Sequence, residues 1–280
     1  MRGQFATHFI ELLKKHPESY RVILGDISVG LFLSDDTSDL SDGVLNVGIL
    51  EQSMLSFAAG ISRGGITPIV HSISPFLIER AYEQLKLDLS YNCNKVILVS
   101  ANGPYDYAKL GPTHHCAADI PLIDLLPRIT WAAPGRLEDV PSVLEWAIKT
   151  EDSVYVRLTN RSCNRPIEPG VVEQASLGEA GDKSRKKLRI VVGEALSATF
   201  RDVSDVSSEH YDLMYLWAPD QLPEVALKTY AYIELWEPYS RSVITSQVKK
   251  NMAQNSELVS FTYPEVIDSG IFDEVDFVRN

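Results

Sequence analysis

The first 160 residues alternate between two patterns of hydrophobic positions. Short apolar runs rich in β-branched residues predict buried strands at 21–24, 66–71, 95–100, 129–133 and 154–158. Between them, apolar positions at helical spacing predict helices at 7–15, 53–63, 76–90, 119–126 and 137–150. Strands that alternate with helices indicate a parallel sheet with helices on both faces. The predicted fold class is therefore α/β.

Composition changes after residue 164, where proline, glycine and basic residues cluster. We interpret 166–187 as a linker between a first domain at 1–165 and a smaller α/β domain at 188–280. The second domain is expected to contain strands near 188–192, 212–217, 232–236 and 258–261, and helices near 222–229 and 240–252. The acidic stretch 34–42 is interpreted as a solvated loop, and the tail 267–280 could dock onto a neighbour.

Composition and charge narrow the class of protein. Of the 280 residues, 45% are hydrophobic and 23% are charged, as in soluble globular enzymes. The net charge of −12 argues against nucleic acid as the main partner, because phosphate binding favours a basic face. The three cysteines show no Cys-x-x-Cys spacing, and we see neither a signal core nor a run of membrane-spanning length. A reducing cytoplasm is the expected location.

One carboxylate lies where charge is poorly solvated. Glu51 follows Asn46-Val47-Gly48-Ile49-Leu50 and begins a predicted helix whose next residues are mostly small or apolar. A Glu held away from water opposite a nitrogen base can share a proton with that base, which is suited to acid/base work on a heteroaromatic ring. The alternative interpretation is a favourable negative charge at a helix N-terminus. Glu51 is thus a candidate catalytic residue.

An ordered set of motifs resembles the pyrimidine-binding domain of the transketolase family. The set is Gly25-Asp26, Asn46-Val47-Gly48-Ile49-x-Glu51-Gln52, Ala58-Ala59-Gly60-Ile61, Phe76 with Arg80-Ala81-Tyr82-x-Gln84, and Gly111-Pro112-Thr113-His114. Deoxyxylulose-phosphate synthases and the β subunits of 2-oxoacid dehydrogenases share part of it. The resemblance covers about residues 20–160, and 188–280 look like a shortened C-terminal domain of the family. It implies a thiamine diphosphate-dependent transferase.

The resemblance implies roles for five residues. Glu51 would hydrogen-bond N1′ of the cofactor's aminopyrimidine, and Phe76 would stack on that ring. Asp26 and Ile27 would lie beside the cofactor, and His114 would face the substrate oxygen. Each has a plainer alternative: Phe76 as a core aromatic, Asp26 as a turn residue and His114 as an ordinary histidine. His114 and the neighbouring His115 should point to opposite sides, so they do not readily share a metal.

The sequence lacks the family's Gly-Asp-Gly motif, which holds the cofactor's diphosphate and its magnesium. By this resemblance the chain cannot hold thiamine diphosphate alone, because the diphosphate would lack its metal and backbone donors. A split enzyme resolves this: a second polypeptide carries the diphosphate domain and Mg²⁺, and two such pairs form a heterotetramer. No metal ligands are assigned to this chain.

The substrate side also departs from the resemblance. Positions that carry His and the phosphate-binding Arg in transketolases are Asn102 and Asn160 here, so Arg157, Arg161 or the partner would have to supply a cation. The leading hypothesis is transfer of a two-carbon ketol unit from a ketose to an acceptor that is not an ordinary aldose phosphate. The alternatives are a 2-oxoacid dehydrogenase β-type subunit and a non-catalytic subunit that binds a partner.

Overall fold

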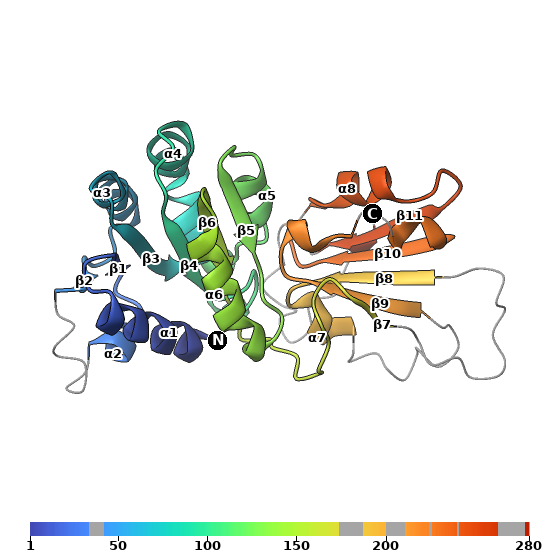
Figure 1. Cartoon of the computed structure of the whole chain (residues 1–280), viewed down its shortest axis with the longest axis horizontal. Helices are drawn as coiled ribbons and strands as arrows, with labels where there is room; N and C mark the ends of the chain where they lie inside the picture. Colours follow the sequence, from blue (N-terminus) through green and yellow to red (C-terminus); the bar gives the residue numbers. More distant parts are fainter. Residues whose placement is uncertain are drawn as a thin grey trace.

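The computed structural model describes residues 1–33, 42–173, 187–199, 211–223, 226–239, 241–262 and 278–279. Within these residues the chain forms two sheets that lie side by side along the long axis of the molecule (Figure 1). The predicted solvated loop, apart from residue 42, lies outside the described residues, as do most of the predicted linker and tail. No helix in the described part of the chain is both long and apolar enough to cross a membrane.

The first sheet is parallel throughout, as expected for an α/β fold. Its strand order is β2-β1-β3-β4-β6-β5. The strands are β1 (Tyr20–Leu24), β2 (Val44–Asn46), β3 (Thr67–Ile73), β4 (Ile97–Ala101), β5 (Ile129–Ala132) and β6 (Ser153–Arg157). The order reverses between β1 and β3, where sites in parallel sheets commonly form, just outside the carboxyl ends of the strands.

Helices cover both faces of this sheet (Figure 1). One face carries α1 (Arg2–Lys15), α2 (Val29–Phe32) and α6 (Val140–Lys149). The other carries α3 (Glu51–Arg63), the π-helical segments Pro75–Glu79 and Leu85–Tyr91 with α4 (Tyr82–Gln84) between them, and α5 (Asp119–Asp124). Short 3-10 turns form at Ala108–Leu110, Pro112–His114 and Leu137–Asp139.

Alternation along the strands explains the two layers. Val22 and Leu24 pack into the α1–α6 layer, whereas Ile23 between them packs into the α3–α5 layer. All five residues of β4 are buried, because both faces of the sheet are covered. In α6 the buried residues Val140, Val143, Leu144 and Ala147 recur at helical spacing and form its inner face.

The second sheet has the order β12-β11-β10-β8-β9-β7. It contains β7 (Val172–Glu173), β8 (Lys187–Val192), β9 (Tyr211–Leu216), β10 (Tyr232–Glu237), β11 (Glu257–Thr262) and β12 (Val278–Arg279). Its four central strands are parallel and its two edge pairings are antiparallel. The helices are α7 (Ala195–Thr199), α8 (Thr245–Asn251) and 3-10 turns at Pro219–Gln221 and Ala226–Thr229.

The two sheets are joined by buried polar contacts as well as by apolar packing. The hydroxyl of Tyr215 accepts a hydrogen bond from the backbone N–H of Gly135 at 2.6 Å and donates one to Asp139 at 2.8 Å. Trp131 and Tyr239 meet edge to face with ring centroids 5.8 Å apart. The second sheet therefore packs against the first near the end of β5.

Several sequence-based predictions differ in detail from the structure. In place of the helix predicted near 222–229, the described residues form a 3-10 turn at Ala226–Thr229. The region 76–90 is not one regular helix, because π-helical turns flank a three-residue α-helical segment. The short strand β2 has no counterpart among the predicted strands. It pairs through only three residues, too few to leave a periodic pattern in the sequence.

Candidate functional site

Glu51 is the first residue of α3, and its side chain is only 1% exposed. Each carboxylate oxygen accepts one hydrogen bond. Ser72 Oγ, on β3, donates to Oε1 at 2.8 Å, and Arg80 Nη1 donates to Oε2 at 2.9 Å. The sequence predicted a poorly solvated carboxylate, and the structure adds the two donors that compensate for its burial.

The loop after β1 closely approaches this carboxylate. A Cβ atom at Gly25 would lie 3.1 Å from Ser72 Oγ, the group that donates to Glu51, so glycine at this position keeps the approach open. Asp26 follows in the left-handed conformation, with φ of 60°, and exchanges hydrogen bonds with Asn46 at the end of β2. Ile27 is half-buried in the same loop. Asp26 and Ile27 therefore lie at the switch point of the sheet.

Phe76 and His114 come together from segments far apart in sequence. Their ring centroids are 5.3 Å apart and nearly perpendicular. Arg80 links the pair to Glu51, because its guanidinium carbon lies 4.2 Å from the centroid of Phe76 while its Nη1 atom holds the carboxylate. The structure thus assembles Glu51, Arg80, Phe76 and His114 into one continuous cluster. His114 is half-exposed, and Thr113 Oγ lies 2.9 Å from its Nδ1.

His115 has a different environment from its neighbour. It is buried, and its Nε2 lies 3.2 Å from the carbonyl oxygen of Ala108. The two adjacent histidines therefore differ as the sequence analysis expected, with only His114 next to Phe76. Among the described residues, no group of three or more His, Cys, Asp or Glu side chains could hold a metal ion.

His71 is a buried polar residue to which the sequence analysis assigned no role. Its Nδ1 lies 2.7 Å from the carbonyl oxygen of Val99, so this nitrogen carries the proton and donates. Its Nε2 lies 2.9 Å from Ser28 Oγ and accepts from that hydroxyl. Burial lowers the pKa of His71 to about 4, which keeps the imidazole neutral. His71 thereby anchors the loop that contains Asp26 and Ile27.

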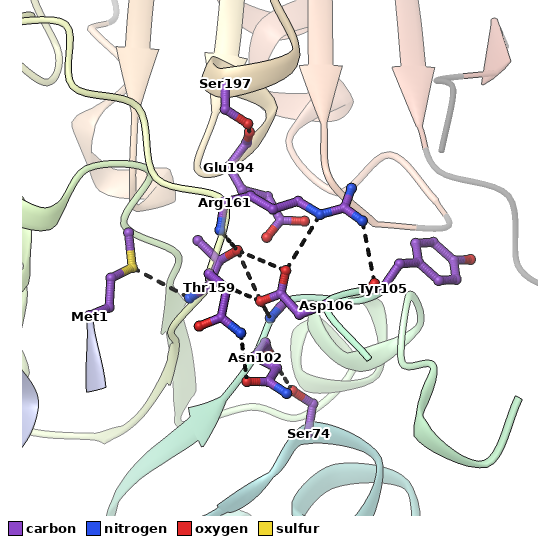
Figure 2. Close-up of polar contacts among 11 residues, drawn as sticks. Met1, Ser74, Asn102, Tyr105, Asp106, Thr159, Arg161, Glu194 and Ser197 are labelled. Atoms are coloured by element: carbon purple, nitrogen blue, oxygen red, sulfur yellow. Dashed lines mark hydrogen bonds and ion pairs between the residues drawn. The ribbon is translucent and has the colours of Figure 1, made fainter. Parts of the chain in front are cut away.

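The cationic candidates for substrate binding have fixed partners. Arg157 is 1% exposed, and its Nη1 donates to Asp119 Oδ1 at 2.9 Å, so this guanidinium belongs to the core. Arg161 is partly exposed and pairs with Asp106 at 3.5 Å. Asn102 lies directly after β4 (Figure 2). The side-chain amide of Asn160 lies 3.5 Å from Asn102 Oδ1.

Three residues of this site were missed or left without a role by sequence reasoning. His71 and Ser72 lie in β3. Two consecutive polar residues interrupt the mostly apolar sequence of this buried strand, and this interruption is the signal that could have identified them. Arg80 lies inside a quoted motif, but its contact with Glu51 joins residues 29 positions apart and cannot be read from local pattern.

The family model described as the transketolase pyrimidine-binding domain matches residues 1–166. The chain belongs to this family. The matched region contains the whole Glu51–Arg80–Phe76–His114 cluster, and all strands of the second sheet lie beyond it.

The chain is similar to two curated relatives, one of which is named as a transketolase subunit. It is 36% identical over 123 residues to one of the subunits of the apulose-4-phosphate transketolase of Actinobacillus succinogenes, a match covering 44% of this chain and 40% of that protein. It is 33% identical over 157 residues to an uncharacterized 33.6 kDa protein in the fasciation locus of Rhodococcoides fascians, covering 56% and 50%. The chain thus spans about half, or less, of the length of these relatives.

Solved structures of transketolases share the fold across both sheets. A structure described as split gene transketolase, inactive beta4 tetramer, has a TM-score of 0.76 and 17% identity, covering 96% of this chain and 89% of that one. The transketolase of Campylobacter jejuni has a TM-score of 0.67 and 12% identity, covering 92% and 41%. At these identities the likeness establishes the fold alone.

Proposed function

We propose that this chain is the pyrimidine-binding subunit of a split, thiamine diphosphate-dependent transketolase-like enzyme of the cytoplasm. It would transfer a two-carbon ketol unit from a ketose to an acceptor, and it would act only with a second polypeptide that carries the diphosphate and magnesium site. The observation that carries the proposal is the buried carboxylate of Glu51 in one cluster with Phe76 and His114.

The residues present fit the pyrimidine half of the cofactor. Glu51 is a buried acid that Arg80 links to Phe76, whose ring is only partly covered, so an aminopyrimidine that displaces Arg80 could stack on Phe76 and hydrogen-bond the carboxyl group. When bound, thiamine diphosphate supplies the carbanion chemistry. Glu51 would hold and return a proton at the ring nitrogen, and Ser72 would keep the carboxyl group oriented through Oε1.

His114 is the candidate acid/base for the substrate. It lies against Phe76 and is half-exposed, so its imidazole can reach a bound sugar hydroxyl. Asp26 and Ile27 would border the cofactor from the loop after β1. Asn102 and Asn160 present neutral amides near the strand ends, which favours an acceptor recognised through hydroxyl groups.

Exposed apolar side chains next to Glu51 support the presence of a partner chain. Ile49 and Leu50 are 62% and 57% exposed directly before Glu51, and Phe57 is 48% exposed on the same helix. Large apolar side chains gathered at one place on a surface commonly mark a protein interface. The Actinobacillus succinogenes relative, which is named as one subunit of a transketolase, supports the same arrangement, for which we propose a heterotetramer of two such pairs.

Reconstitution tests the function. The chain mixed with a separately purified diphosphate-domain subunit should consume a ketose donor without added 2-oxoacid, and neither chain alone should do so. A requirement for a 2-oxoacid would instead identify a dehydrogenase β-type subunit. Tight binding of thiamine diphosphate by this chain alone, measured by calorimetry, would contradict the split arrangement.

Two isosteric substitutions test the residue roles. Glu51→Gln should abolish turnover, and His114→Asn should lower kcat by about 100-fold while leaving cofactor affinity unchanged. Both variants should still assemble with the partner, as judged by gel filtration. Glu138→Gln, at an exposed carboxylate, is the matched control. Unchanged turnover in Glu51→Gln would favour a non-catalytic, partner-binding subunit.

A further inference from the structure

A buried carboxylate of the second sheet is inserted against the first. Glu194 follows β8 (Figure 2), is 2% exposed, and lies directly against Gly103 in the loop after β4. A Cβ atom at position 103 would lie 2.0 Å from Glu194 Oε2, so an alanine there would force the Glu194 side chain to shift. Within the described part of the chain, Oε2 finds no hydrogen-bond partner although it is fully buried. Such an atom is stabilised far better on a protonated acid than on a carboxylate.

A second carboxylate, Asp106, lies in the same cluster and organises the loop. Its Oδ2 accepts hydrogen bonds from the backbone N–H groups of Gly103 at 2.8 Å and Asn160 at 2.7 Å. Arg161 pairs with Asp106 and also donates to the carbonyl oxygen of Tyr105 at 3.3 Å (Figure 2). These bonds tie the start of loop 103–116 to the end of β6. The same loop carries His114 at its far end.

The charges facing Glu194 do not balance its ionised form. Asp106 repels it, Arg161 is shared with Asp106, and Arg157 is already paired with Asp119. Burial, and next the Asp106 carboxylate, raise the pKa of Glu194 to about 7; Arg157, a hydrogen bond with Thr159 and Arg161 oppose the rise. Near neutral pH the cluster therefore exists in two charge states.

We propose that Glu194 is a positioning residue through which the second domain holds loop 103–116, and that the proton on Glu194 determines how firmly the loop is held. With the proton, the cluster is compact and Glu194 packs against Gly103 of the loop. Without it, two carboxylates compete for one shared guanidinium and the contact at Gly103 weakens. The consequence for His114 rests on the proposed function, but the effect on the loop does not.

Proton linkage determines whether a rise in pH strengthens or weakens the contact between Glu194 and the loop. The pKa of Glu194 is higher in the docked state than the usual value near 4.5, so docking takes up a proton between these values. The stabilising effect is complete below pH about 4.5 and is lost as pH rises through about 7. The loop should therefore become more open across this window.

Hydrogen exchange of the full-length chain tests the proposal. After correction for intrinsic chemical exchange, amides in loop 103–116 should exchange about tenfold faster at pH about 8 than at pH about 5.5. Glu194→Gln, which is neutral at every pH, should give a flat profile, and Glu138→Gln at an exposed carboxylate should behave as wild type. Gly103→Ala should open the loop at all pH values.

Two results would overturn the proposal. One is a flat corrected profile in the wild-type chain, which decides the question even if Glu194→Gln does not fold. The other is a Glu194→Gln profile that still rises with pH as in wild type. Since neither readout uses turnover, failure here leaves the proposed enzyme function standing, and an inactive reconstituted pair leaves this proposal standing. In an active pair, kcat of the wild type should decline as pH rises through about 7, and kcat of Glu194→Gln should not.

Discussion

Arg80 and Glu51 form an ion pair of 2.9 Å, and the same guanidinium covers the ring of Phe76 at 4.2 Å. Arg80 thus occupies both groups that we assign to the aminopyrimidine. Since Ser72 already bonds one oxygen of Glu51, a ring nitrogen can reach the carboxyl group only where Arg80 now lies.

Removing Arg80 should therefore strengthen cofactor binding. Arg80→Met keeps most of the aliphatic stem and deletes the charge. Because the side chain of Arg80 is 42% exposed, the ion pair is worth about 1 kcal/mol, and affinity for thiamine diphosphate should rise about fivefold. Calorimetric titration of the reconstituted pair measures this. Arg128→Met, which breaks an exposed pair with Asp152, is the control. Weaker binding by Arg80→Met would show that the arginine assists the cofactor.

A charge placed beside Glu51 should prevent assembly with the partner. Leu50→Asp puts a carboxylate on a side chain that is 57% exposed at the proposed interface. The isolated chain should fold normally, since little buried contact is lost, but the complex should dissociate at least about tenfold more readily. Sedimentation of the mixed subunits checks this. Leu125→Asp changes a leucine that is 72% exposed directly after α5 and should assemble like wild type. Normal assembly of Leu50→Asp would show that the interface does not include Leu50.

The fold could be predicted to a large extent because the periodic spacing of hydrophobic residues indicates most of its helices and strands. The central strand β4 is mostly apolar and buried along its whole length, and α3 and α6 have regular buried faces. The elements that were not predicted contain few residues or have an irregular backbone. The strand β2 spans only three residues, and the π-helical turns around Arg80 disturb helical spacing.

The candidate site could be predicted only in part, and for a different reason. Glu51 stood out because a single carboxylate begins an otherwise small and apolar helix. Its partners Ser72 and Arg80, and the position of Glu194 against Gly103, arise from contacts between distant segments. Arg157 illustrates the limit: its sequence position was compatible with substrate binding, but burial beside Asp119 makes it part of the core.

Stability at acidic pH should depend on His71. Its pKa is about 4 in the folded chain and about 6.5 when unfolded, so the unfolded state binds a proton that the folded state does not. The free energy of unfolding should fall as pH drops from about 6.5 to about 4, by about 3 kcal/mol from this group. His71→Gln should lose this contribution, measured as the difference in urea unfolding between variant and wild type. Parallel profiles for the two proteins would contradict it.

The buried pair of Arg157 and Asp119 should be essential to the fold but replaceable as a pair. Asp119 also accepts hydrogen bonds from Tyr155 at 2.7 Å and from the backbone N–H of Ile120 at 2.7 Å. Asp119→Ala leaves a buried guanidinium without its partner and should cost about 3–5 kcal/mol in urea unfolding at neutral pH.

The double variant Asp119→Ala/Arg157→Met removes both charges and should recover at least about half of that loss. Asp124→Ala, at an exposed carboxylate on the same helix, is the control and should cost less than about 1 kcal/mol. A double variant as unstable as Asp119→Ala would mean that the lost hydrogen bonds, and not the stranded charge, dominate. A double variant that folds and keeps full turnover with the partner would establish that Arg157 does not bind the substrate.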